Sequence, residues 1–456
     1  MDWFPEAGVT RRRVLGSIGA SVPVMAGCLG SGTLPNPNPT DWPQAGYDSG
    51  ATYFKSAGSP PVEEPQLAWD ASVWATDMQS DATLTDPGTW EIRTPLLIVD
   101  DRAYCIDGTI VDMADGRVRD DATTTGEGKR RDTECHHTYA LIEFARTNAY
   151  RDGTLVATRR RGMRDHRGSA GDILEGLRPP PSVDADGWCG TTKRWTAGSR
   201  RGFDATAAAG RIEDGVVVTV VPGETGPFSV VAIDADDRRA EWETTVSHPV
   251  DRLRVEDGRV FAATSSETGG KLSVLDDTGI SRTVETGAET TLVAVRDGIA
   301  YLRESQSGNS TASIVALDSE TGEWRPLIDA PSALDDQLAG STAGIGDIVV
   351  GPERLYTVVN TKGTDSDVCL AVNRDDQAIE WQRRLPTTTR ITGTDDALYL
   401  HRADGRAVAL EPSSGDRLWT YDRLSASANA DPGRPVVGND KLLFPYGKHL
   451  VALEAP

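Results

Sequence analysis

Short apolar runs alternate with polar turns along most of the chain, and one phrase recurs. An alternating run such as Val-Ala-Leu is followed by Asp, Ser and Gly residues, and then by a second run that often carries a Trp. Alternation with a period of two predicts a strand with one buried face, and the Asp- and Gly-rich stretch predicts a tight turn. The phrase is therefore typical of a β-hairpin, and helical periodicity is nearly absent from the chain.

The copies of this phrase are regularly spaced. Each copy is marked by its last apolar residue before the turn, namely Ile233, Leu275, Leu317, Val372, Leu410 and Leu453, with a weaker copy at Val111. The six clear copies are on average 44 residues apart, and a shorter strand with a polar turn precedes most of them. Each unit therefore holds about four antiparallel strands, and such units repeated at this spacing are typical of a β-propeller, an all-β fold.

The number of blades and their closure can also be predicted. The gap from Val111 to Ile233 is too long for one unit, and residues 139–161 resemble a degraded copy, so we expect eight blades, with seven as the alternative. The last copy lacks a fourth strand, and residues 65–72 resemble that strand alone. We expect this N-terminal strand to complete the last blade and hide its edge. Residues 65–456 then form one propeller domain, with an insertion near residues 163–203 that fits no blade.

The N-terminus has the layout of an export signal. Arg11 and Arg12 stand in a twin-arginine pattern, followed by an apolar stretch of 14 residues at 14–27. That stretch is too short to span a hydrocarbon core of ~30 Å. Cys28 ends a lipobox-like sequence, so residues 1–28 are a predicted signal and residues 29–64 a predicted tether and N-terminal extension. We expect twin-arginine export and a lipid anchor on the outer face of the cytoplasmic membrane, with a cleaved but unlipidated signal as the alternative.

The composition is strongly acidic. The chain has 69 acidic and 47 basic residues, a net charge of −22, and only 7 of the basic residues are lysines. This balance favours an extreme halophile, because the Debye length of ~3 Å in molar salt screens the repulsion between surface carboxylates. Nucleic-acid binding is not expected, since no basic footprint is present.

Cysteine and histidine residues suggest little chemistry. Cys105 and Cys369 lie in apolar runs and read as small buried residues. Cys135 and Cys189 either form a disulfide or remain free thiols. Cys135 is followed by two histidines, but three consecutive residues rarely ligate one ion, so no metal site is assigned. No set of catalytic residues is recognisable either.

The repeated phrase resembles the pyrroloquinoline-quinone-type propeller repeat. Residues 41–54 also resemble the W-P-x-x-x-x-D segment that often opens such propellers, so the resemblance covers roughly residues 41–456. The repeat occurs in quinoprotein dehydrogenases and in the non-catalytic propeller lipoprotein of the outer-membrane β-barrel assembly machinery (BamB-like). It implies that the repeat tryptophans pack between neighbouring blades, namely Trp69, Trp242, Trp324, Trp381 and Trp419.

The resemblance leaves more than one function open. Quinoprotein dehydrogenases bind the quinone with calcium ligands and an Asp base, and many carry adjacent cysteines, which this sequence lacks. We therefore expect no enzyme activity, no quinone cofactor and no calcium. The sequence favours a monomeric, membrane-anchored scaffold that binds another cell-surface or membrane protein. The alternatives are a surface protein that binds a small molecule or polysaccharide, and a quinone-dependent dehydrogenase.

Overall fold

The computed structural model describes residues 42, 47–48, 51–56, 60–72, 97–99, 101–104, 110–118, 143–151, 154–160, 172–178, 192–197, 211–213, 216–222, 228–234, 240–264, 269–305, 312–329, 343–361, 366–386, 388–422, 424, 433–446 and 449–456. By its internal contacts the chain divides into two units, Met1–Thr33 and Leu34–Pro456, and every described residue lies in the second. All regular elements of the described residues are strands, and none of these residues forms a helix long and apolar enough to cross a membrane.

The described residues form eight sheets, five of which are built from four consecutive strands. The strands of these five are β6 Glu143–Arg151, β7 Thr154–Arg160, β8 Asp172–Arg178 and β9 Thr192–Ala197; β10 Arg211–Glu213, β11 Val216–Pro222, β12 Phe228–Asp234 and β13 Ala240–Val246; β14 Arg252–Glu256, β15 Arg259–Thr264, β16 Gly270–Asp276 and β17 Gly279–Thr286; β18 Thr290–Arg296, β19 Ile299–Ser305, β20 Ala312–Asp318 and β21 Trp324–Asp329; β22 Ala343–Val350, β23 Arg354–Thr361, β24 Ser366–Asn373 and β25 Ile379–Pro386.

The other three sheets use strands from the N-terminal part of the chain. One contains β3 Leu97–Val99, β4 Arg102–Tyr104 and β5 Ile110–Asp112. A second contains β26 Thr388–Thr394, β27 Leu398–Arg402, β28 Ala407–Leu410 and β29 Arg417–Tyr421, with β1 Phe54–Lys55 added in parallel to β26. The third contains β30 Val436–Gly438, β31 Lys441–Tyr446 and β32 His449–Glu454, with β2 Gln66–Ser72 as its outer strand.

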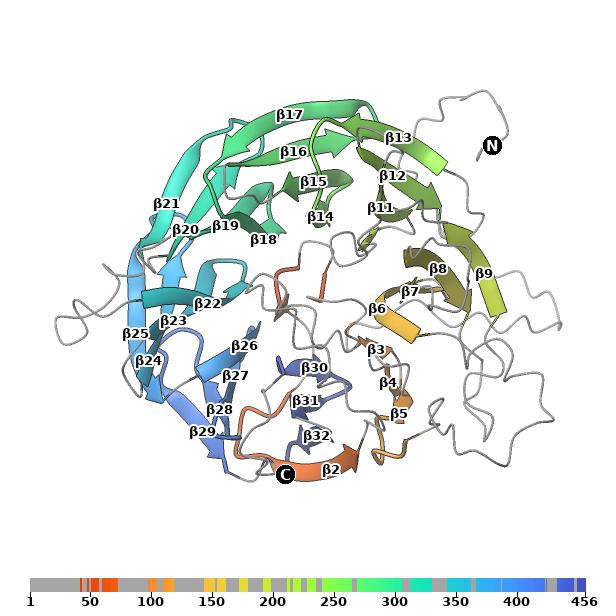
Figure 1. The fold of residues 1–456 in the computed structure, drawn as a ribbon. Coiled ribbons are helices and arrows are strands. Elements are labelled where there is room, and N and C mark those ends of the chain that lie inside the picture. The colour runs from red at the N-terminus through yellow and green to blue at the C-terminus, as the bar shows by residue number, and fades with distance from the viewer. Residues whose placement is uncertain are drawn as a thin grey trace, which may run out of the picture. The chain divides into compact units, whose positions relative to one another are not determined.

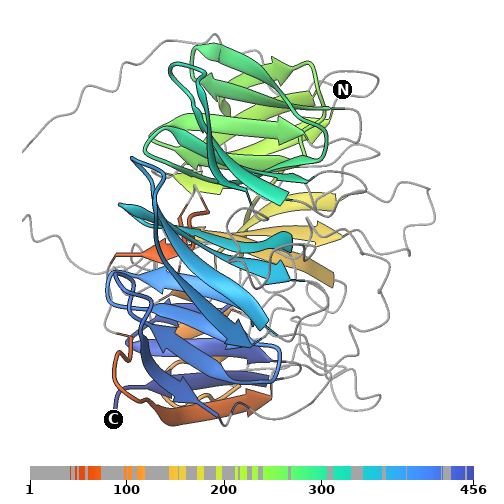
Figure 2. The same ribbon diagram turned by 90° about the vertical axis from the view of Figure 1, so that its left-hand side faces the viewer.

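The first strands of successive sheets lie beside one another. Contacts link β3 to β6, β6 to β10, and so on through β14, β18 and β22 to β26 (Figure 1). Gly438 at the end of β30 lies against Ile98 of β3, since an added Cβ would be 2.6 Å from Ile98 Cδ1. We call these first strands the inner layer. Figure 2 shows the sheets from the side, with β22–β25 towards the viewer.

The turns between first and second strands show why the sequence forms hairpins. Asp257 and Gly258 have φ angles of 50° and 73°, and Asp297 and Gly298 have φ angles of 55° and 72°. Two consecutive residues with positive φ define the type I′ turn, whose twist matches that of the flanking strands and which favours Asp-Gly. The predicted all-β fold of four-stranded antiparallel sheets is confirmed by these elements.

The N-terminal strand β2 pairs antiparallel with β32, with Leu67 opposite Leu453 and Trp69 opposite Ala452. The markers predicted from the repeat lie in third strands, as Leu275 does in β16. The number of blades in the complete propeller, and its closure by β2, stay predictions.

Two predicted boundaries differ from the structure. The range 163–203 contains β8 and β9, which pair with each other and, through β8, with β7, so it is not an insertion. Consecutive Ile-Leu and Glu-Gly pairs in β8 break the alternation that marks a strand, so the pattern hid it. The fold also begins before residue 65, because Trp42 and Phe54 are buried in the same core cluster as Trp69.

Candidate functional site

The described residues between 42 and 55 (42, 47–48 and 51–55), which we call the axial segment, join the first strands of three sheets. Trp42 exchanges two backbone hydrogen bonds with Ile98 of β3, at 2.8 and 2.9 Å. The amide of Val350 at the end of β22 donates to the carbonyl of Thr52 at 2.9 Å, and β1 pairs in parallel with β26. One stretch of backbone therefore satisfies edge groups of three inner-layer strands, which would otherwise lie unpaired.

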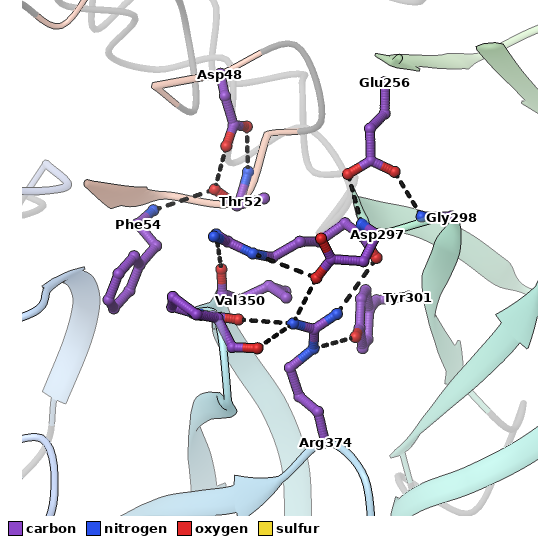
Figure 3. Close-up of polar contacts among 12 residues, drawn as sticks. Asp48, Thr52, Phe54, Glu256, Asp297, Gly298, Tyr301, Val350 and Arg374 are labelled. Atoms are coloured by element: carbon purple, nitrogen blue, oxygen red, sulfur yellow. Dashed lines mark hydrogen bonds and ion pairs between the residues drawn. The ribbon is translucent and has the colours of Figure 1, made fainter. Parts of the chain in front are cut away.

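The sequence of the axial segment explains its conformation. Asp48 is the acidic residue of the W-P-x-x-x-x-D motif. Its carboxylate accepts hydrogen bonds from the amide of Thr52 at 2.9 Å and from the Thr52 hydroxyl at 2.5 Å, which closes the loop before β1 (Figure 3). Phe54 then packs onto Gly351 and Gly393, where an added Cβ would lie 3.0 and 2.9 Å from its ring.

A group of three charged side chains from three successive sheets lies beside this segment. Asp347 of β22 accepts a hydrogen bond from Arg390 of β26 at 3.0 Å and forms an ion pair at 2.9 Å with Arg434, which precedes β30. Both contacts involve Asp347 Oδ1. The three side chains are 9%, 13% and 12% exposed, respectively. We call Asp347, Arg390 and Arg434 the inner triad; two guanidinium groups share one carboxylate in it.

Tyr53 and His401 lie next to residues of the inner triad. The ring of Tyr53 in the axial segment lies 3.4 Å from Arg434 Cζ, which fixes the guanidinium by a cation–π contact. His401 lies opposite Arg390 in the sheet, and its Nδ1–H donates to the carbonyl of Gly433 at 2.9 Å. Burial lowers the pKa of His401 to about 4, and the charge of Arg390 acts in the same direction. The imidazole is therefore neutral near pH 7, and the positive charge comes from the arginines.

A second polar cluster connects turns of neighbouring sheets (Figure 3). Arg374, which follows β24, donates from Nε to the Tyr301 hydroxyl at 2.6 Å and from Nη1 to Asp297 at 2.9 Å. Its Nη1 also donates to the carbonyls of Gly351 and Pro352. These acceptors belong to two sheets, so the guanidinium of Arg374 holds the two sheets together.

The same cluster extends to a third sheet. Both oxygens of Glu256 accept from the β18–β19 turn, at 2.6 Å from the amide of Asp297 and 2.7 Å from that of Gly298. Burial raises the pKa of Glu256, although these two amides oppose that effect. The carboxylate of Glu256, at the end of β14, therefore holds the β18–β19 turn against its own sheet.

The residues of the inner triad do not fit a calcium site. Calcium takes ~6–8 oxygen ligands, whereas Asp347 is held between two guanidinium groups whose charge repels a further cation. Within the described ranges, no group of three or more His, Cys, Asp or Glu side chains is placed to hold a metal ion. The structure therefore gives no step through calcium or a quinone, and the expected lack of a cofactor stays a prediction.

Three of the five repeat tryptophans contact the next sheet. The indole N–H of Trp69 donates to Met113 O at 3.0 Å, and that of Trp381 to Pro412 O at 2.8 Å. Trp419 donates in the same way to Pro61 O at 3.1 Å. Met113 and Pro412 follow the third strands β5 and β28 of their sheets, and Pro61 precedes the outer strand β2. Each indole therefore joins its own sheet to the next one.

Trp242 and Trp324 are only half-buried, and their packing role stays a prediction. Sequence reasoning missed Arg282, which takes the register position in β17 that Trp381 takes in β25. Its guanidinium donates to the carbonyls of Glu320 at 2.5 Å and Thr321 at 3.0 Å in the next sheet. Arg282 therefore makes the contact with the next sheet that Trp69, Trp381 and Trp419 make in other sheets.

Several predicted residues lie outside the described residues. These are the export arginines Arg11 and Arg12, the lipidation residue Cys28, and the cysteines Cys105, Cys135 and Cys189. Cys369, expected to be a small buried residue, is a free thiol with no exposed surface.

The inner triad was missed because its members are far apart in the sequence. A signal was present, however, since Asp347, Arg390 and Arg434 are 43 and 44 residues apart, close to the repeat spacing. Charged residues that recur at the period of a propeller are placed on neighbouring sheets, where their side chains can meet.

Comparisons with known proteins agree with this fold. Residues 310–455 match the family model described as outer membrane protein assembly factor BamB. No curated protein matches the chain. The match to the family model covers about a third of the chain and is consistent with the predicted pyrroloquinoline-quinone-type propeller repeat.

Among solved structures, a quinohemoprotein alcohol dehydrogenase from Pseudomonas putida HK5 is similar with a TM-score of 0.53 and 12% identity, over 91% of this chain and 80% of that one. The quinohemoprotein alcohol dehydrogenase from Comamonas testosteroni has a TM-score of 0.51 and 12% identity over the same shares. A europium-containing methanol dehydrogenase has a TM-score of 0.50 and 11% identity, over 89% of each chain. At these identities the likeness concerns the fold alone.

Proposed function

We propose that this protein is a non-catalytic propeller that acts as a protein-binding scaffold or assembly factor, tethered to the outer face of the cytoplasmic membrane. The match of residues 310–455 to an assembly-factor model supports this proposal. The twin-arginine pattern and Cys28 support export and lipid anchoring.

The observation that carries the non-catalytic part is the use of the inner layer for packing. The axial segment bonds to β3, β22 and β26, and Asp347 is engaged by two arginines and by the amide of Ile391 at 3.3 Å. A general base or nucleophile needs a proton-accepting group that is within reach of a substrate. The carboxylate of Asp347 instead forms ion pairs with Arg390 and Arg434.

The outer strands offer a surface for a protein partner. Exposed large apolar side chains occur at similar places on the outer strands of four sheets, at 40–50% exposure, namely Leu67, Ile280, Ile379 and Leu418. Three of these sheets, those with outer strands β25, β29 and β2, follow one another in the chain. Exposed apolar groups beside a strand that ends a sheet suit a partner that docks side chains or adds a strand.

Site-directed photocrosslinking tests the scaffold function. A photoreactive residue is placed at Ile379 or Leu418, and at Glu285 as an exposed polar control on β17, and each full-length chain is expressed in cells grown in molar salt. We expect the same discrete crosslinked protein from Ile379 and Leu418 and none from Glu285. The absence of a product at both apolar positions, or the same product at Glu285, would contradict a docking surface there.

Two further measurements separate anchoring from catalysis. Cys28→Ser should release the protein from the membrane fraction into the medium, and retention of this variant would contradict the lipid anchor. Purified protein supplied with the quinone and calcium should show no dye-linked oxidation of alcohols. A quinone-dependent activity would overturn the non-catalytic role.

A further inference from the structure

We draw no further inference here: the strongest candidate, the exposed apolar side chains of Leu67, Ile379 and Leu418 on the outer strands β2, β25 and β29, belongs to the docking surface already proposed, and nothing in the part of the chain that the structure describes shows what covers it.

Discussion

Gly415, in the turn between β28 and β29, tests how an indole docks onto the next sheet. Its φ is +69°, and an added Cβ would lie 2.5 Å from Cε3 of Trp381, which is 8% exposed. Gly415→Ala therefore has two costs. An L-residue in the left-handed region costs about 1–2 kcal/mol, and displacing a packed ring costs about 1–3 kcal/mol more.

Gly258 provides the matched control. Its φ is +73°, but no atom lies within 4 Å of an added Cβ. Gly258→Ala should therefore lose only the conformational part, about 1–2 kcal/mol, whereas Gly415→Ala should lose about 2–5 kcal/mol. The free energy of unfolding is measured by denaturant titration in molar potassium chloride, with circular dichroism as the signal.

The comparison can refute the packing argument. Equal losses for Gly415→Ala and Gly258→Ala would mean that the indole does not limit the space at Gly415. A second check uses Trp381→Leu as the background, because a smaller side chain relieves the overlap. In that background the added cost of Gly415→Ala should fall to the conformational part, and full additivity of the two changes would contradict the contact.

Three further predictions follow from other contacts. Arg354 Nε donates to Glu380, which lowers the pKa of that carboxyl below its usual value of 4.5, so its stabilisation is present at neutral pH and is lost as the pH falls through the lowered pKa. Glu380→Gln should therefore cost about 1 kcal/mol or less at pH 7, and denaturant titrations should show this difference from wild type disappearing in acid; a difference that persists there would contradict the pairing. Trp69→Ala should cost about 3–5 kcal/mol in the same titration at neutral pH, because it empties a buried site and leaves the carbonyl of Met113 without its indole donor; a loss below about 1 kcal/mol would contradict that role. Burial raises the pKa of Cys369 to about 12, so iodoacetamide should label it only after unfolding, as mass spectrometry can check, and labelling of the folded protein would contradict its burial.

The parts of the fold that could be predicted from the sequence depend on local chemistry. Asp257-Gly258 and Asp297-Gly298 specify their hairpins by turn preference alone, and the repeat spacing then predicts four-stranded units. Strand β8 could not be recognised, because pairing with neighbouring strands can form a strand where the local pattern is poor.

The candidate site depended instead on contacts between distant residues. The W-P-x-x-x-x-D motif was recognisable, but nothing near Thr52 in the sequence indicates that its carbonyl meets Val350. Asp347 and Arg434 have ordinary sequence neighbours, and only their spacing at the repeat period links them. Long-range pairing of this kind is fixed by the tertiary fold, which local propensity does not encode.

The pairing of the N-terminal segments with the last strands has a consequence for the order of events during synthesis. Lys55 donates to the carbonyl of Val437, 382 residues away, and His449 contacts Asp70 across 379 residues. While the ribosome is still translating the middle of the chain, the Val437 carbonyl that accepts from Lys55 and the strand β32 that pairs with β2 do not yet exist. Closing loops of this length is entropically costly and slows folding. The newly made protein therefore passes through a stage in which its N-terminal strands lack their C-terminal partners, and a chain that stops before β32 leaves the backbone of β2 without the strand that pairs with it.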